Sequence, residues 1–238
     1  MTISAISFDY WNTLVQARTD IAELRAAAWD ELLSRWGVEA EPGLVVAAVE
    51  AEWHAHQDAW RRNEQYTGER AGRSAVERLG LPLSAARREE MVEAFVGVGG
   101  PDVFHLCPGV PELLARLDEA GVRLGIICDV GLTPSTRLRA LLEHHGLLDA
   151  FDGWSFSDEV GTYKPAAAIF RHALGYLGVE PAGMAHVGDL RRTDIAGAQA
   201  MGITAVRYTG VFDDSSEGPS GDHVVSDHAD LPEVLGLG

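Results

Sequence analysis

Two apolar runs in this sequence end on carboxylates that could do chemistry. Ile6–Phe8 runs into Asp9, and Met184–Val187 is followed by Gly188 and then Asp189. Open α/β sheets place their chemistry just past the carboxyl ends of their strands. Carboxylate oxygens there can bind a hard cation such as Mg²⁺ or attack an electrophile. The two stretches therefore predict one shared site for a metal ion and group transfer.

Further polar side chains follow predicted strands elsewhere in the chain. The sequence has 18 arginines but one lysine, Lys164, which lies in a loop after the predicted strand Trp154–Ser157. Lysine carries a compact point charge, unlike the planar fork of arginine. Carboxylates and one ammonium group converging in a cleft would make a Mg²⁺ and phosphate site. The other candidates at strand ends are Asn12, Thr13, Cys128, Asp129 and Asp194.

The order of the predicted elements brings these residues together. From Pro108 onward strands alternate with helices, which predicts βαβ units and a parallel sheet covered on both faces. Residues 16–105 instead show helical periodicity throughout, so they form an insertion that would cover the site as a lid. We predict an α/β fold with a Rossmann-like core, residues 1–15 and 106–238, and an inserted all-helical cap, residues 16–105. The expected cap helices run from Thr19-Asp20 to Gly37 and over about Pro42–Arg62, Thr67–Leu79 and Ser84–Val98.

Composition limits the possible partners. A net charge of −17 repels nucleic acid and anionic lipid, and no apolar run reaches the roughly 18–20 residues of a membrane span. The first residues lack the pattern of a secretory signal, and only two cysteines are present. We therefore expect a cytoplasmic protein, monomer or homodimer, that acts on a small molecule rather than on nucleic acid or a membrane.

The candidate stretches occur in the order and rough spacing of the four motifs of the haloacid dehalogenase superfamily, which the chain resembles over nearly its whole length. The insertion is similar to the helical cap of subclass I of that superfamily. The matching stretches are Phe8-Asp9-Tyr10-Trp11-Asn12-Thr13-Leu14, Cys128-Asp129, Tyr163-Lys164-Pro165 and Gly188-Asp189-Leu190-Arg191-Arg192-Thr193-Asp194.

This resemblance implies a Mg²⁺-dependent phosphatase or phosphotransferase of a small phosphorylated metabolite. Asp9 resembles the nucleophile that forms an aspartyl-phosphate, and Lys164 resembles the cation that holds nucleophile and phosphate together. The implied metal ligands are Asp9, the main-chain carbonyl of Trp11, Asp189 and Asp194. The implied phosphate-binding residues are Trp11, Asn12, Thr13, Cys128 and Asp129.

Two positions depart from the family pattern. Cys128 replaces the usual Ser or Thr, and its thiol is a weaker donor. Trp11 occupies the position where family phosphatases place an aspartate that protonates the leaving oxygen, and losing such an acid costs about 10²–10⁴ in rate. Either another group replaces the acid, or the leaving group needs none. Candidates for replacement are Asp129, His54 and His56; Arg61, Arg62 and Tyr66 are candidates for contacting the rest of the substrate.

Two other functions remain open. Haloacid dehalogenases resemble this chain in having an aromatic residue at the Trp11 position, but they use no metal and lack the paired acids that Asp189 and Asp194 provide. A non-catalytic binding protein on the same scaffold would explain both Trp11 and Cys128. The presence of Asp9 and Lys164 argues against that third interpretation.

Overall fold

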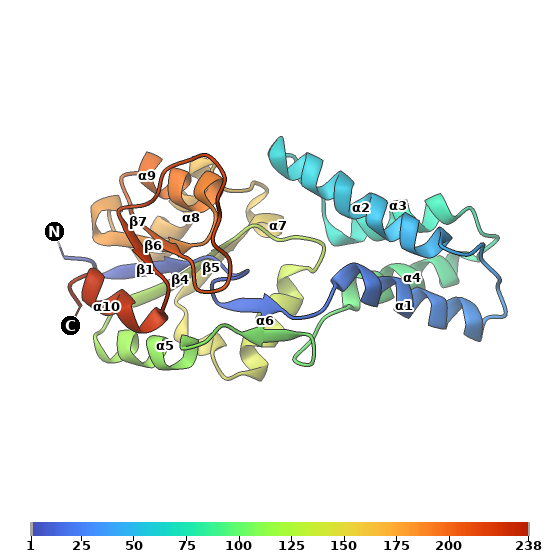
Figure 1. Cartoon of the computed structure of the whole chain (residues 1–238), viewed down its shortest axis with the longest axis horizontal. Helices are drawn as coiled ribbons and strands as arrows, with labels where there is room; N and C mark the ends of the chain where they lie inside the picture. The colour runs from blue at the N-terminus through green and yellow to red at the C-terminus, as the bar shows by residue number, and fades with distance from the viewer. Residues whose placement is uncertain (1, 238) are drawn as a thin grey trace.

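The computed structural model describes residues 2–237 and consists of a sheet-based core with a helical cap at one end (Figure 1). The core contains six parallel strands in the order β5-β4-β1-β6-β7-β8. This order confirms the predicted α/β fold. The strands are β1 (Ala5–Phe8), β4 (Arg123–Cys128), β5 (Gly153–Phe156), β6 (Met184–Gly188), β7 (Thr204–Tyr208) and β8 (His223–Val225).

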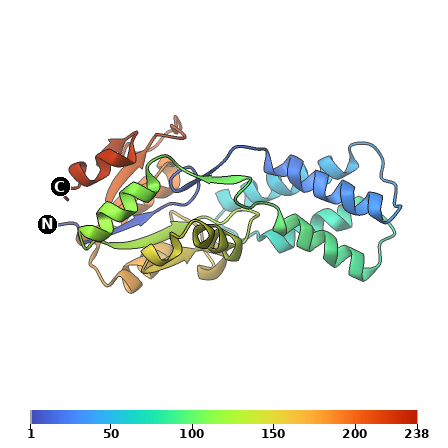
Figure 2. The ribbon, with the colours of Figure 1, turned by 90° about the horizontal axis from the view of Figure 1, so that it is seen from below.

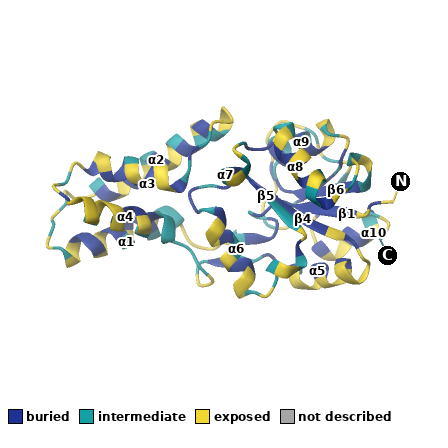
Figure 3. Cartoon of the chain, turned by 180° about the vertical axis from the view of Figure 1, so that it is seen from behind, coloured by how far each residue is buried: buried dark blue, intermediate teal, exposed yellow. Residues whose placement is uncertain are grey.

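Helices cover both faces of this sheet, and its central strands β1, β4, β6 and β7 are largely buried (Figures 2 and 3). One face packs against apolar side chains of α5, α6 and α10, and the other against those of α8 and α9. Strands buried on both faces explain why the strand sequences are nearly continuous apolar runs. The helices are α5 (Val110–Glu119), α6 (Ser135–His144), α7 (Ser157–Val160), α8 (Ala167–Leu177), α9 (Ala196–Ala200) and α10 (Leu231–Val234).

The register of the central strands brings three chain segments to one level. Phe8 of β1 pairs with Ile126 of β4 on one side and with Val187 of β6 on the other. The residues that follow these strands therefore emerge together at the carboxyl edge of the sheet. In open parallel sheets this edge is the place for a ligand.

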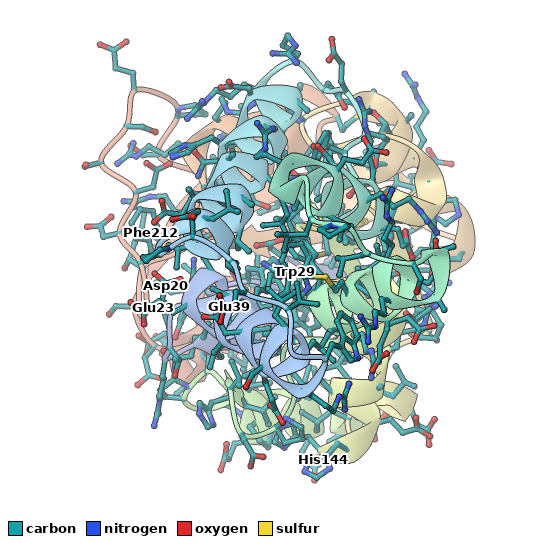
Figure 4. All side chains as sticks on the ribbon, turned by 90° about the vertical axis from the view of Figure 1, so that its right-hand side faces the viewer. Asp20, Glu23, Trp29, Glu39, His144 and Phe212 are labelled. Atoms are coloured by element: carbon teal, nitrogen blue, oxygen red, sulfur yellow. The ribbon has the colours of Figure 1, made fainter. Side chains whose placement is uncertain are left out.

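The cap contains the four predicted helices, whose bounds lie within two residues of the expected ones. Three of these helices are capped at their N-termini by side chains that accept hydrogen bonds from backbone N–H groups. The capping residues are Asp20, Thr67 and Ser84. Trp29 lies fully buried between the helices, and its indole N–H donates to the carbonyl of Met91 at 2.7 Å (Figure 4). The helices are α1 (Ile21–Arg35), α2 (Leu44–Arg61), α3 (Gly68–Leu79) and α4 (Ala85–Gly97).

The structure differs from the prediction where the chain enters and leaves the cap. Residues 16–105 are not helical throughout, because β2 (Val15–Ala17) and β3 (Phe104–Leu106) pair as a two-stranded antiparallel sheet. Each strand has three residues, too few to show periodicity, and its partner lies almost ninety positions away in the sequence. The predicted helix from Thr193 also begins differently, with a π-helical turn over Arg191–Ile195 ahead of α9.

No helix within residues 2–237 combines the length and apolarity needed to cross a membrane. Short 3₁₀ turns at Leu148–Ala150, Pro181–Gly183 and His228–Asp230 complete the connections of the core.

The start of α3 rests directly on the core, which yields a prediction. A Cβ at Gly68 would lie 2.4 Å from the carbonyl oxygen of Leu132, in the loop after β4. Gly68→Ala should therefore push the cap away from the core and lower the free energy of unfolding by about 1–3 kcal/mol. Urea denaturation measures this change.

Gly97→Ala is the matched control, because a Cβ at this helical glycine of α4 would meet only Arg137 Nη2, at 3.6 Å. It should leave stability unchanged or raise it by about 0.4–1 kcal/mol. Equal stabilities of the two variants would contradict the close contact.

Candidate active site

Three buried carboxylates meet at the carboxyl ends of β1 and β6. Asp9 follows β1, Asp189 follows β6, and Asp194 lies in the π-helical turn that comes next. One oxygen of each carboxylate lies within 4.8 Å of the others. The structure therefore brings together the acidic residues of two stretches about 180 positions apart in the chain.

The ammonium group of Lys164 lies among these carboxylates. Its Nζ donates to Asp9 Oδ1 at 2.5 Å, to Asp194 Oδ1 at 2.6 Å and to the carbonyl of Ile127 at 2.9 Å. Burial alone would lower the pKa of Lys164, but the charges of Asp194 and Asp9 outweigh it and raise the pKa well above its usual value. The charged Lys164 side chain therefore bridges Asp194 and Asp9 through two ion pairs. Within residues 2–237, no donor bonds to Oδ2 of Asp9, so that oxygen is available for reaction.

Asp194 is fully occupied by protein donors. Although burial opposes its ionisation, Lys164 and then His186 hold the pKa of Asp194 below its usual range. This carboxylate is therefore ionised and held in one position. Because both of its oxygens already accept hydrogen bonds, its main role is to orient Lys164 and His186. Its Oδ1 accepts from Lys164 Nζ and His186 Nε2 at 2.6 and 3.0 Å, and its Oδ2 accepts from Leu190 N and Thr193 Oγ1 at 3.1 and 3.3 Å.

His186 is a site residue that sequence reasoning missed. It pairs in register with Ser7 across β6 and β1, and its Nδ1 lies 2.8 Å from Ser7 Oγ. Burial lowers the pKa of His186, so the ring is neutral, its Nε2–H donates to Asp194 and its Nδ1 accepts from the serine hydroxyl. The sequence did contain a signal for this pair, because Ser7 and His186 are polar residues within otherwise apolar strands.

The remaining carboxylates carry more negative charge than the protein balances. Burial, followed by the charge of Asp194, raises the pKa of Asp189 to about 7. Burial, with the charges of Asp194 and Asp189, also raises the pKa of Asp9 despite Lys164. Asn12, in a left-handed conformation with φ 56°, donates to Asp189 Oδ2 at 3.1 Å. A buried, oxygen-only set with one ammonium for three carboxylates fits a divalent cation such as Mg²⁺.

Trp11 lies in the wall of the same site as an apolar side chain. Its ring packs edge-to-face against Tyr10 and against Phe104 of β3, with centroid distances of 5.1 and 5.0 Å. Thr13 is fully buried nearby in the chain, and its hydroxyl has no partner within residues 2–237. Cys128 is fully buried at the end of β4, and burial raises its pKa, so it is a neutral thiol.

Asp129 links the cap to the loop that carries Lys164. Its Oδ1 accepts the backbone N–H of Lys164 at 2.7 Å, and its Oδ2 accepts the indole N–H of Trp60, near the end of α2, also at 2.7 Å. Burial raises the pKa of Asp129 to about 6. The guanidinium of Arg192 lies over the Trp60 ring, 3.9 Å from its centre, in a cation–π contact.

A second link joins the same two parts. Asn63, which follows α2 with φ 56°, accepts the backbone N–H of Tyr163 at 2.8 Å and the hydroxyl of Thr162 at 3.1 Å. The sequence pattern indicated neither Trp60 nor Asn63 as a residue of the site, because helical periodicity does not show which side chains at a helix end reach another domain.

The cap residues proposed from sequence have different positions. His56 is buried and His54 is exposed, and both line the cleft between cap and core. Arg61 and Arg62 form exposed ion pairs with nearby acids, and the Tyr66 hydroxyl donates to Glu52 inside the cap. These three side chains are absent from the cleft wall, contrary to expectation.

The cleft has a volume of about 890 Å³ and reaches from the acidic cluster into the cap. Aromatic rings form much of its wall away from the carboxylates. These rings belong to Trp11 after β1, Phe104 of β3, Trp53 and Trp60 of α2, and Phe212 of the loop after β7. Figure 4 labels Phe212.

Comparison with known proteins yields one family. The family model described as haloacid dehalogenase-like hydrolase matches residues 3–202. The chain is 26% identical over 241 residues to protein CbbY of Cereibacter sphaeroides, covering 99% of this chain and 96% of that protein. It is 27% identical over 222 residues to the (S)-2-haloacid dehalogenase of Pseudomonas sp. (strain YL), covering 91% and 88%. Three further curated relatives are matched over only 51%, 44% and 42% of their length.

Solved structures show the same fold. A HAD phosphatase from Thermococcus onnurineus superposes with a TM-score of 0.69 at 25% identity, covering 99% of this chain and 98% of that one. The HAD-hydrolase YfnB from Bacillus subtilis, solved bound to magnesium, superposes with a TM-score of 0.66 at 17% identity, covering 99% of both chains.

The link between Trp60 and Asp129 can be tested by removing one donor. Trp60→Phe removes the indole donor from the half-buried carboxylate of Asp129. A hydrogen bond to a charged group contributes about 1.5–3 kcal/mol, so the free energy of unfolding should fall by up to that amount. The cap should also sample more open positions. Urea denaturation and small-angle X-ray scattering measure the two effects.

Trp53→Phe is the control from the same helix, since Trp53 is 44% exposed and its indole donates to no group within residues 2–237. This change should stay within about 0.5 kcal/mol of the parent. If the two variants behave alike, the hydrogen bond to Asp129 does not hold the cap.

Proposed function

The chain belongs to the haloacid dehalogenase-like hydrolase family, and from this premise we propose that it is a Mg²⁺-dependent phosphatase or phosphotransferase of a small phosphorylated metabolite. The observation that carries the proposal is the buried cluster of Asp9, Lys164, Asp189 and Asp194. A carboxylate with one free oxygen, tied to an ammonium and flanked by two further acids, suits phosphoryl transfer.

In the proposed reaction, Oδ2 of Asp9 attacks phosphorus. A bond forms between this oxygen and phosphorus while the ester or anhydride bond to the leaving group breaks, which gives an aspartyl-phosphate. Water or another acceptor then takes the phosphoryl group and releases Asp9. Lys164 holds Asp9 in place and neutralises charge on the transferring group throughout.

The metal would be held by Asp9, Asp189 and, as the family resemblance implies, the carbonyl of Trp11, with Asp194 behind them. Bound Mg²⁺ would supply charge neutralisation for the phosphoryl oxygens. Asn12, Thr13, Cys128 and Asp129 would surround the phosphate. Asn12 and Asp129 line the cleft, whereas the side chains of Thr13 and Cys128 are fully buried.

The cap would exclude water and contact the leaving group. We assign residues 16–105 to the cap and residues 1–15 and 106–238 to the catalytic core. We further propose a cytoplasmic enzyme, monomer or homodimer, whose partner is a small phosphorylated molecule.

Trp11 restricts the substrates. No carboxylic acid stands at this position to protonate a leaving oxygen, and Asp129 accepts hydrogen bonds at both of its oxygens. His56 is neutral, since burial lowers its pKa, so it offers no proton either. Acyl phosphates, whose carboxylate leaves without protonation, fit this site better than alkyl phosphates.

Dehalogenation is the second candidate, because the aromatic Trp11 and the haloacid dehalogenase relative both favour it. The buried acids Asp189 and Asp194 argue against it, since displacement of halide by Asp9 needs no additional carboxylates. Halide release from a 2-haloacid without metal would establish this alternative.

The proposed reaction depends on Asp9 and on a divalent cation. Asp9→Asn should lower Mg²⁺-dependent phosphate release from acetyl phosphate by about 10³-fold or more, and EDTA should abolish it in the parent. Phosphate release is measured colorimetrically. The control is Asp118→Asn, which changes an exposed carboxylate of α5 and should retain full activity. Mg²⁺ binding without any turnover would instead support a binding protein.

The missing acid predicts a strong dependence on the leaving group. The parent should hydrolyse acetyl phosphate about 10²–10⁴ times faster than ethyl phosphate, beyond the ratio for the uncatalysed reactions. Trp11→Asp should raise turnover of the alkyl phosphate selectively, while Trp11→Phe should not. Comparable rates of the parent on both substrates would show that another residue protonates the leaving group.

A further inference from the structure

Arg25 of α1 is a buried cation on the cap side of the cleft. The residue is only 4% exposed and lines the cleft wall. Its Nε donates to the carbonyl of Phe95 at 3.0 Å, and its Nη2 donates to the hydroxyl of Thr133 at 3.2 Å. The guanidinium also lies 4.7 Å from the centre of the Phe95 ring. These contacts hold the group at a defined place between the cap and the loop after β4.

No carboxylate balances this charge within residues 2–237. Arg25 forms no ion pair there, and its Nη1 has no hydrogen-bond acceptor. The other charged side chains of the cap wall, Asp20 and Glu50, are exposed acids that do not reach it. Burial lowers the pKa of Arg25 to about 10, so the group remains charged at neutral pH. An unpaired buried charge is unfavourable unless a ligand completes it.

Among the described residues, Arg25 is the cationic group of this cap-side wall. His56 lies in the same wall, and its Nδ1–H donates to the carbonyl of Tyr66 at 3.2 Å, which leaves an unprotonated Nε2. Burial, and then the charge of Arg25, keep the pKa of His56 low. Most of the remaining wall is apolar or aromatic, so an anion entering it would meet Arg25 in a region of low polarity, where charge attraction is strong.

We propose that Arg25 binds an oxyanion, a carboxylate or a second phosphate, on the leaving group of the substrate while the reacting phosphate lies at Asp9. This proposal rests on the proposed phosphoryl-transfer function and adds a substrate class to it. Charge-assisted hydrogen bonds of a guanidinium to an oxyanion are short and strong, and they orient the ligand. The substrate is therefore a phosphorylated compound with a second anionic group, separated from the first by a carbon skeleton that the aromatic wall covers.

A matched pair of ligands isolates this interaction. 4-Carboxyphenyl phosphate and 4-carbamoylphenyl phosphate have the same shape, but only the first has a second anionic group. With Asp9→Asn protein in Mg²⁺, which should bind without turning over, calorimetry should show about 10- to 100-fold tighter binding of the carboxylate compound. 1,4-Phenylene bisphosphate in the same assay shows whether a second phosphate is preferred to a carboxylate.

Variants separate binding from a structural role of the arginine. Arg25→Met should abolish the preference for the carboxylate compound. Arg25→Gln, which keeps hydrogen-bonding capacity without charge, should also abolish it and replaces Arg25→Met where that variant fails to fold. Thr133→Val is the matched control, because it removes the tie to the core but keeps the cation, and it should retain the preference.

The outcomes also separate this proposal from the proposed function. Equal affinities for the two ligands, or equal loss in Arg25→Gln and Thr133→Val, would overturn the oxyanion site even if the parent releases phosphate from both compounds. If the parent releases no phosphate but still binds the carboxylate compound more tightly in a way that depends on Arg25, the phosphatase proposal is wrong. The oxyanion site at Arg25 is then supported.

Discussion

The ion pair network of Lys164 is the interaction on which the rest of this structure depends. Three carboxylates lie within a few ångströms of one another in a buried place, and the ammonium contacts two of them. Without a cation there, burial and mutual repulsion would protonate the acids or drive them apart. The sheet explains how the network forms at all. The register of β1 between β4 and β6 delivers Asp9, Asp189 and the carbonyl of Ile127 to one level, and Lys164 joins them from the loop beyond β5.

The loop that carries Lys164 also receives the cap. Its backbone is held by Asp129 at Lys164 and by Asn63 at Tyr163, and Asp129 in turn accepts the indole of Trp60 from α2. Hydrogen bonds therefore couple the position of the cap to the position of the lysine. A cap movement that breaks the bond to Trp60 would remove a donor from the same carboxylate that orients the lysine backbone.

The fold and the meeting of the acidic residues at one sheet edge were largely predictable from sequence, because both follow from local patterns. Strands that alternate with helices, and carboxylates that follow apolar runs, are visible without knowing any long-range contact. The residues that sequence reasoning missed act through pairings that no local pattern encodes. His186 matters because β6 happens to place it opposite Ser7, β2 and β3 exist only as partners of each other, and Arg25 is recognisable as a cleft residue only when Thr133 and Phe95 are seen around it.

Trp11 connects the chemistry of the site to the entry of the cap. Its backbone forms an isolated bridge with Val15 at the start of β2, and its ring packs on Phe104 of β3. Trp11 therefore contacts both strands of the two-stranded sheet through which the chain enters and leaves the cap. An aspartate here would put a charged group against that aromatic contact. The tryptophan therefore stabilises the cap entry with an apolar contact and cannot transfer a proton. Trp11 and Arg25 line the same cleft, so the two proposed restrictions on substrate, on its leaving group and on its second anion, would act on one bound molecule.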